Sequence, residues 1–203
     1  MTITLYDAAA SGHAHRVRLF LSLLGIEHET VTIDLRKNEH KTDAYRKLSP
    51  LGQVPTLTDG DIVVTDSCAA LVYLAKKFGK GNWLPEDAVG AAQVQRWLSA
   101  ASGELYRGPV LARAAKLFGR DLDYDSACAW SKRLLTWMQD ELSARKWLAA
   151  DHATIADIAM YSYLSVADEG GIDLSPYPAV LRWLAEVEQL DNFIPMMRAA
   201  QPD

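Results

Sequence analysis

Hydrophobic residues in the first part of the chain repeat with two periods that follow each other. Residues 2–6 are rich in β-forming side chains, and residues 17–24 carry hydrophobic side chains at helical spacing as far as Gly25. Residues 29–35 then alternate as a strand does. The hydrophobic face of this strand consists of Val31, Ile33 and Leu35. The pattern predicts a β-strand, a helix and a second β-strand.

A short helix and a hairpin are predicted next. The polar stretch 39–50 is typical of a short, irregular helix. Residues 54–58 and 61–64 have the composition of two strands joined through Asp59-Gly60. This dipeptide is a strong hairpin signal because glycine accepts a positive φ.

The alternation of strands and helices stops soon afterwards. Residues 68–78 have helical spacing, and a linker containing glycine and proline follows at 80–85. No convincing strand pattern recurs beyond it. We therefore predict an α/β domain of order βαβ-αββα over residues 1–79 and an all-helical domain over residues 86–203.

Four hydrophobic repeats with helical spacing mark the second domain. They cover residues 94–105, 130–138, 155–162 and 180–187. Five of the six tryptophans also lie in this half, which fits a helical bundle built on large side chains.

Composition and charge exclude several classes of function. Hydrophobic residues make up 49% of the chain, enough for a well-buried core, and the net charge of −5 argues against a nucleic-acid partner. No hydrophobic run is long enough to span a membrane, and the N-terminus lacks a signal-peptide pattern, so we expect a cytoplasmic protein. Cys68 and Cys128 lie far apart and suggest neither a disulfide framework nor a metal site.

Two pairs of polar residues stand where helices are expected to begin. Asp66 and Ser67 are favoured capping residues, and the free N–H groups of a helix start also bind anions. Thr154 and Asp157 have the spacing of a capping box before a hydrophobic run. We assign this second pair a structural role, and we expect loss of Asp157 to cost about 1 kcal/mol or more.

Five short motifs in the same order and spacing resemble the cytosolic glutathione S-transferase family. They are "SGHAHRVRLFLSLLG", "NEHK", "GQVPTL", "TDS" and "TIADIA". The resemblance extends over essentially the whole chain and points to a bacterial, serine-type member with phi, theta and zeta features. It implies a thioredoxin-like N-terminal domain, a helical C-terminal domain, and an enzyme that uses glutathione as co-substrate without a metal. It further implies a homodimer formed through the third and fourth helices, where Tyr73 and Arg96 look exposed.

The resemblance assigns glutathione to residues along the first domain. It implies a cis bond between Val54 and Pro55, which turns the backbone of Val54 toward the cysteinyl part of the tripeptide. Ser67 would hold the γ-glutamyl carboxylate and Asp66 would face its ammonium group. The glycine carboxylate would be held by His40, Lys41 and Gln53.

Ser11 is the catalytic residue implied by the resemblance, as a hydrogen-bond donor to the glutathione thiolate. A free thiol has a pKa of about 8.5, and a hydroxyl donor together with the positive end of the first helix lowers it. His13 is the second candidate, since related classes carry cysteine, serine or asparagine near this position. Tyr6 is assigned a packing role. The electrophile pocket is expected between the domains, near Tyr106, Arg107 and Val110.

Conjugation of glutathione to a small hydrophobic electrophile is the expected activity. A glutathione-dependent isomerase of the zeta type is an alternative, although "SGHAH" lacks the serine-serine-cysteine run of that class. A non-catalytic interaction module with the same fold is a second alternative. Retention of the residues expected to bind glutathione argues against the module.

Overall fold

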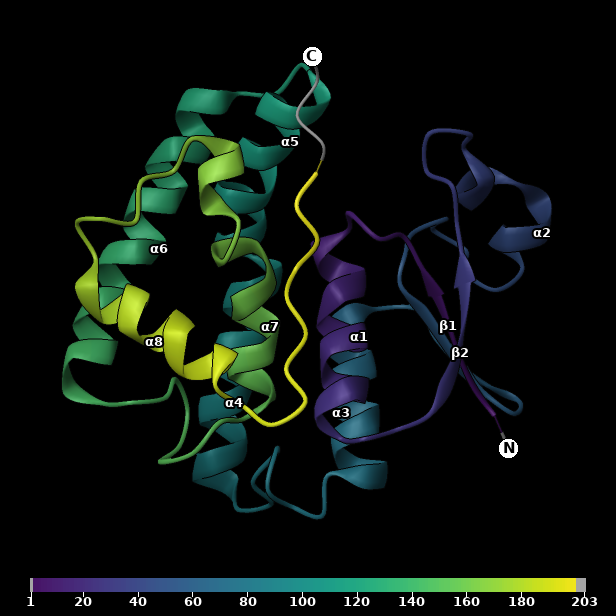
Figure 1. Ribbon diagram of the computed structural model, residues 1–203, viewed down its shortest axis with the longest axis horizontal. Helices are drawn as coiled ribbons and strands as arrows, with labels where there is room; N and C mark the ends of the chain where they lie inside the picture. The colour runs from purple at the N-terminus through teal and green to yellow at the C-terminus, as the bar shows by residue number, and fades with distance from the viewer. Residues whose placement is uncertain (1, 200–203) are drawn as a thin grey trace.

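The computed structural model describes residues 2–199, in which a small α/β domain lies beside a larger helical one (Figure 1). The first domain contains one four-stranded sheet in the order β2-β1-β3-β4. β1 is parallel to β2 and antiparallel to β3, and β3 pairs antiparallel with β4. The strands are β1 (Ile3–Asp7), β2 (His28–Thr32), β3 (Thr56–Asp59) and β4 (Ile62–Val64).

Helices of the first domain follow the predicted order. Figure 1 shows α1 and α3 between the sheet and the helical domain, with α2 away from that domain. Gly60 has φ +60° in the tight turn between β3 and β4, as the hairpin signal predicts. The helices are α1 (Gly12–Leu23), η1 (Glu39–Lys41), α2 (Asp43–Arg46) and α3 (Ser67–Phe78).

The second strand is shorter and more exposed than its pattern predicts. β2 ends at Thr32, and Ile33 makes one further hydrogen bond to Asp7, the last residue of β1 (2.7 Å). Because β1 goes no further, the chain beyond this point has no strand to pair with. Val31 and Leu35 are each 39% exposed, so only Ile33 of the expected hydrophobic face is buried. Position at the edge of the sheet explains the difference.

The helical domain contains more elements than the four predicted. The repeat expected over residues 94–105 is divided, because α4 ends at Ser102 and a π-helical turn containing Pro109 follows. This turn and the next helix were missed, since proline interrupts the hydrophobic spacing on which the prediction rests. The elements are α4 (Ala88–Ser102), η2 (Tyr106–Val110), α5 (Leu111–Phe118), α6 (Tyr124–Ala144), α7 (Ile155–Leu164), η3 (Ala167–Gly170) and α8 (Pro178–Glu188).

Helix α7 forms the centre of the molecule. Every one of its residues is buried, and it packs against α4 and α8 on one side and α1 and α3 on the other. The predicted capping box is present at its start. Thr154 N–H donates to Asp157 Oδ2 (2.8 Å), while the Thr154 hydroxyl oxygen accepts from the first turn. Because α7 packs against α1, it fixes the position of α1 relative to the helical domain.

The end of the described chain ties the two domains together. Figure 1 shows this segment, in yellow, running along α1. The Ser22 hydroxyl donates to the carbonyl of Asn192 (2.7 Å), and His15 contacts Ser162 of α7 (2.9 Å) and the carbonyl of Ile194 (3.0 Å).

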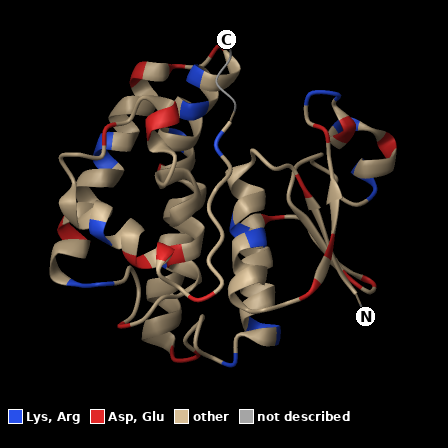
Figure 2. Ribbon diagram, in the orientation of Figure 1, with Lys and Arg blue, Asp and Glu red and all other residues tan. Residues whose placement is uncertain are grey.

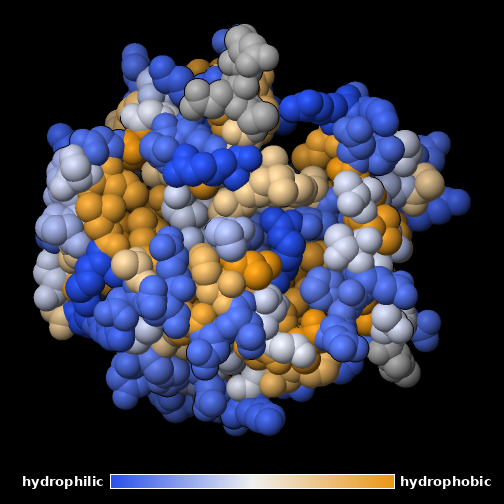
Figure 3. Space-filling model, in the orientation of Figure 1, coloured by the Kyte–Doolittle hydropathy of each residue, from blue (hydrophilic) through white to orange (hydrophobic). Residues whose placement is uncertain are grey.

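The surface carries charges of both signs in close mixture. Acidic and basic residues are interspersed along both domains (Figure 2), and hydrophilic residues separate the hydrophobic patches on the face in Figure 3. Within residues 2–199, no helix is long and apolar enough to cross a membrane, and no cluster of three metal-ligating side chains is found. The proposed linker at 80–85 lies between α3 and α4, and its bounds stay a prediction.

Candidate active site

Ser11 begins helix α1 directly after the loop that follows β1. Its backbone N–H donates to the carbonyl of Ala8 (2.8 Å), and its hydroxyl oxygen accepts from the N–H of Ala14 (3.3 Å). Accepting one hydrogen bond leaves the hydroxyl proton free to be donated elsewhere. The capping role and the predicted role as a donor are therefore compatible.

The helical domain holds this loop in place through Arg113 of α5. Its guanidinium donates to the carbonyl of Ala10 (3.0 Å), the residue before Ser11, and pairs with Glu169 (2.6 Å). Both charged side chains are 4% exposed. The position of Ser11 therefore depends on both domains.

The loop before β3 presents a free stretch of backbone. The Val54–Pro55 bond is cis, as the resemblance implies. The carbonyl of Gln53 accepts from the hydroxyls of Tyr45 (2.9 Å) and Ser49 (3.0 Å). Among residues 2–199, no hydrogen bond uses the backbone of Val54, so its N–H and C=O are available to a peptide ligand.

His40 and Lys41 lie against the same loop. The Lys41 amino group donates to the carbonyls of Gly52 (2.9 Å) and Leu51 (3.3 Å). Gly52 has φ +58°, and a Cβ there would meet the carbonyl oxygen of His40 at 2.4 Å, so this close approach requires glycine. Burial, followed by the charge of Lys41, lowers the pKa of His40. The structure thus brings His40 and Lys41 close to Gln53, whose side chain is exposed.

Asp66 and Ser67 begin helix α3 in two different ways. Asp66 is exposed and caps the helix, with Oδ1 accepting from the N–H of Ala69 (2.8 Å). Ser67 is 3% exposed, and its hydroxyl oxygen accepts from the guanidinium of Arg16 (3.1 Å). The start of α3 therefore offers helix N–H groups beside a buried positive charge, which is an environment for an anion.

His13 lies in the first turn of α1, between the two domains. Its ring meets Tyr163 of α7 edge-on at 5.0 Å and lies 6.3 Å from the ring of Tyr106. Its Nδ1 is 3.1 Å from the guanidinium of Arg16. Burial, followed by the charge of Arg16, lowers the pKa of His13 to about 3, so the ring is neutral near neutral pH.

The contact between the domains at this point requires Gly12. A Cβ on Gly12 would lie 2.6 Å from the Tyr163 ring. Burial raises the pKa of Tyr163, so its hydroxyl stays protonated. Glycine therefore lets α7 approach the start of α1, the helix end expected to face the sulfur.

Comparison with known proteins places the chain in one family. The model of the glutathione S-transferase N-terminal domain matches residues 10–77, and that of the C-terminal domain matches residues 120–191. A maleylpyruvate isomerase from Ralstonia sp is 30% identical, with 98% of each chain covered. The chain belongs to the glutathione S-transferase family.

Solved structures also support the assignment of this chain to the glutathione S-transferase family. A glutathione S-transferase from Pseudomonas fluorescens is 29% identical, with a TM-score of 0.91 over 98% of this chain and 100% of the other. A glutathione transferase homologue from Drosophila mojavensis with bound glutathione is 26% identical, with a TM-score of 0.85 over 94% and 89%. The predicted family, the thioredoxin-like and helical domains, and the glutathione transferase activity are confirmed. A non-catalytic module is set aside.

The three residues expected to line the electrophile pocket of the transferase lie in different environments. Tyr106 is 45% exposed and neighbours His13. The guanidinium of Arg107 lies over the ring of Trp130 (5.1 Å), and Val110 is buried in the hydrophobic core. The structure therefore brings only Tyr106 of these three beside a predicted catalytic residue.

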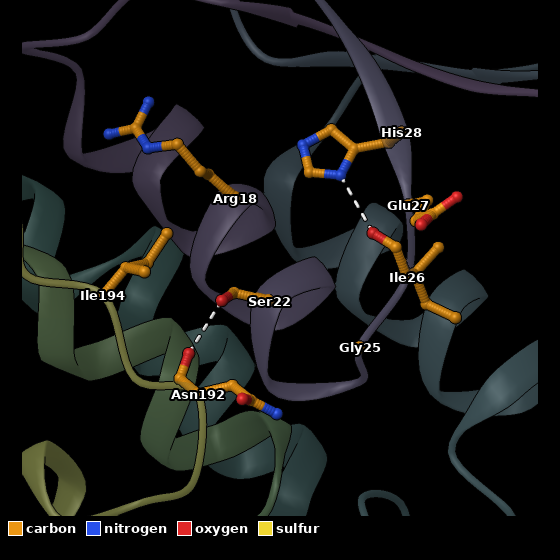
Figure 4. A pocket seen from close by; sticks show the side chains of 8 residues that line it. All are labelled: Arg18, Ser22, Gly25, Ile26, Glu27, His28, Asn192 and Ile194. Atoms are coloured by element: carbon orange, nitrogen blue, oxygen red, sulfur yellow. Dashed lines mark hydrogen bonds between the residues drawn. The ribbon is translucent and has the colours of Figure 1, made fainter.

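A groove of about 760 Å³ lies on another side of α1 (Figure 4). Arg18, which lines it, is two residues from Arg16, and two helical steps place the side chains on opposite faces. Arg18 forms an ion pair with Asp7. None of the residues predicted to bind glutathione lines this groove, so it is separate from the candidate active site of the transferase.

Sequence reasoning missed three residues that support this site. The sequence motifs assign no role at the site to Arg16, Tyr45 or Arg113. The "RVR" motif signals charge at this position, but burial of Arg16 follows only from the packing of α1 against α3 and α7. Arg113 and Ala10 are 103 residues apart, so no local pattern could join them. Tyr6 packs edge-on against Tyr45 (6.0 Å), which supports its predicted packing role.

Proposed function

We propose that the chain binds reduced glutathione along the cis-Pro55 loop and the start of α3, and joins it through its sulfur to a small hydrophobic electrophile. The unpaired backbone of Val54 is the observation that carries this proposal. It offers one donor and one acceptor to the cysteinyl part of the tripeptide, as an added short strand would use them. Gly52 and Pro55 on either side keep this backbone in place.

The two ends of the tripeptide have separate partners. Ser67 and the N–H groups of α3 bind the γ-glutamyl carboxylate, and Asp66 faces the ammonium group. His40, Lys41 and Gln53 bind the glycine carboxylate at the other end. The contact of Lys41 with two carbonyls supports this placement, since it holds the amino group beside the loop. The Drosophila mojavensis homologue, which has bound glutathione, supports the same ligand here.

Activation of the sulfur is assigned to Ser11, with His13 beside it. The Ser11 hydroxyl donates a hydrogen bond to the sulfur and stabilises the thiolate without forming a covalent bond. The thiolate then attacks the electrophile, and two reactants are held together in one site. We further propose a cytoplasmic homodimer formed through α3 and α4, because members of this family are typically homodimers.

Glutathione-dependent isomerisation is the second candidate. The Ralstonia relative bears the name maleylpyruvate isomerase and matches over 98% of the chain. Such a reaction uses the same bound thiolate, which adds to a carbon–carbon double bond and leaves after rotation. Both candidates therefore share the glutathione site and differ in the second substrate.

The test is a rate assay with glutathione and a panel of electrophiles, alongside a maleyl-type acid for isomerisation. We expect conjugation, and we expect Ser67→Ala to raise KM for glutathione about tenfold, because a buried hydrogen bond to a carboxylate is lost. Ser126→Ala is the matched control, since Ser126 is exposed near the start of α6. Isomerisation without conjugation would favour the second candidate. Neither reaction, or equal KM for both variants, would contradict the proposed site.

A further inference from the structure

Arg16 is a buried guanidinium with no acidic partner among the described residues. It is 1% exposed, and its Nη1 contacts Ser67 Oγ and His13 Nδ1, each at 3.1 Å, with Cys68 Sγ at 3.9 Å. Its Nε and Nη2 are buried without a hydrogen-bond partner in residues 2–199. A buried charge of this kind is costly unless the site it serves supplies an anion.

The contact between Arg16 and His13 determines where the imidazole proton lies. An arginine side chain only donates hydrogen bonds, so Nδ1 of His13 must accept. A neutral imidazole carries one proton, which is therefore on Nε2. Burial, followed by the charge of Arg16, lowers the pKa of His13 to about 3, so the ring is in this neutral form near neutral pH.

The Nε2 atom of His13 is free to meet a ligand. No hydrogen bond in residues 2–199 uses it, and it is not among the fully buried atoms without a partner. His13 is two residues beyond Ser11 in the first turn of α1. The site thus has two donors at the start of one helix: the hydroxyl of Ser11 and Nε2–H of His13.

We propose that Arg16 is a positioning residue that holds His13 as a donor to the sulfur of bound glutathione, which then receives hydrogen bonds from both His13 and Ser11. This inference rests on the proposed function. It makes the histidine at position 13 the counterpart of the small polar residue in related classes.

Groups from every neighbouring element surround this pair. Ser67 and Cys68 of α3 face Arg16, and Tyr163 of α7 meets both the guanidinium (5.9 Å) and the imidazole. The ring of Tyr106 of η2 lies 6.3 Å from the imidazole. None of these faces His13 with a carboxylate that would hold a second proton on the ring.

The first test reads the imidazole proton in the ligand-free protein. Nitrogen NMR of the His13 ring is expected to show Nε2 protonated and Nδ1 unprotonated between pH 8 and about pH 5. A proton on Nδ1, or titration near the ordinary pKa of about 6.5, would overturn the proposal. This result does not depend on whether the protein binds glutathione.

The second test measures the pKa of the enzyme-bound thiol by ultraviolet titration of its thiolate. We expect His13→Ala and Arg16→Met each to raise this pKa by about one unit, and the double variant to raise it little further, because Arg16 acts through His13. Arg16→Lys keeps a charge in the core if Arg16→Met fails to fold, and should give a smaller rise. Arg133→Met, at an exposed position of α6, should leave the value unchanged.

The outcomes separate this inference from the function on which it rests. Additive effects of the two substitutions, with a thiolate present in the wild type, would contradict the role of Arg16 alone. An unaltered pKa in His13→Ala would contradict the role of His13. A wild type that yields no bound thiolate would contradict the proposed function.

Discussion

Replacing Ser11 by alanine is expected to lower kcat/KM for conjugation about 10- to 100-fold at neutral pH. A hydrogen bond to a charged group contributes about 1.5–3 kcal/mol, and this is lost where the charge is the reacting thiolate. KM for glutathione should change little, because Ser11 contacts neither carboxylate of the tripeptide. The rate of the variant should recover as pH rises, since higher pH ionises the thiol without help. A pH profile of kcat/KM measures both effects.

Ser11→Thr is the matched control for this substitution. Threonine keeps the hydroxyl and the helix cap, so it should retain most of the rate and the stability. Ser11→Ala also removes the cap and should lower the free energy of unfolding by about 1 kcal/mol. If Ser11→Ala kept the full rate while His13→Ala lost it, His13 would be the main donor to the sulfur, and the fold assignment would stand.

Replacing Asp157 by alanine is expected to lower the free energy of unfolding by about 3–5 kcal/mol. Its carboxylate accepts from Thr154 N–H, from Leu148 N–H (3.0 Å) and from the indole of Trp183 (2.9 Å). Asp157 is fully buried, so alanine would leave these donors without a partner. This exceeds the cost of a helix cap alone, because two of the donors lie outside the capping box. Chemical denaturation of both proteins measures the difference.

Asp168→Ala provides the comparison. Asp168 pairs with Arg198 at the surface, where its side chain is 65% exposed. An exposed pair contributes about 0–1 kcal/mol, so this variant should be nearly as stable as the wild type. Similar losses for both aspartates would show that the buried hydrogen bonds of Asp157 stabilise the fold no more than an exposed ion pair does.

Local chemistry made much of the fold predictable. The hairpin between β3 and β4 followed from the conformational freedom of Gly60, and the capping box from the spacing of Thr154 and Asp157. Helix α3, the last element of the first domain, followed from its regular hydrophobic repeat. The length of β2 could not be predicted, because it depends on where β1 ends. The π-helical turn at Pro109 was missed because it follows no regular hydrophobic period.

In the candidate site, too, features set by local sequence were predictable and contacts between distant segments were not. Motifs near one another in the sequence identified the cis-Pro55 loop and the start of α3, where backbone geometry decides what can bind. The support for Ser11 and His13 comes from Arg113 and Arg16, whose contacts join distant segments. Charge in the sequence says nothing of burial, and burial determines what these two arginines do.

Calorimetric titration with reduced glutathione shows whether the cis-Pro55 loop and the start of α3 bind the tripeptide. We expect saturable heat with a Kd below about 1 mM, and much weaker binding of cysteinylglycine, which lacks the γ-glutamyl group assigned to Asp66 and Ser67. Absence of heat at millimolar glutathione, or equal affinity for the shorter peptide, would contradict this mode of binding.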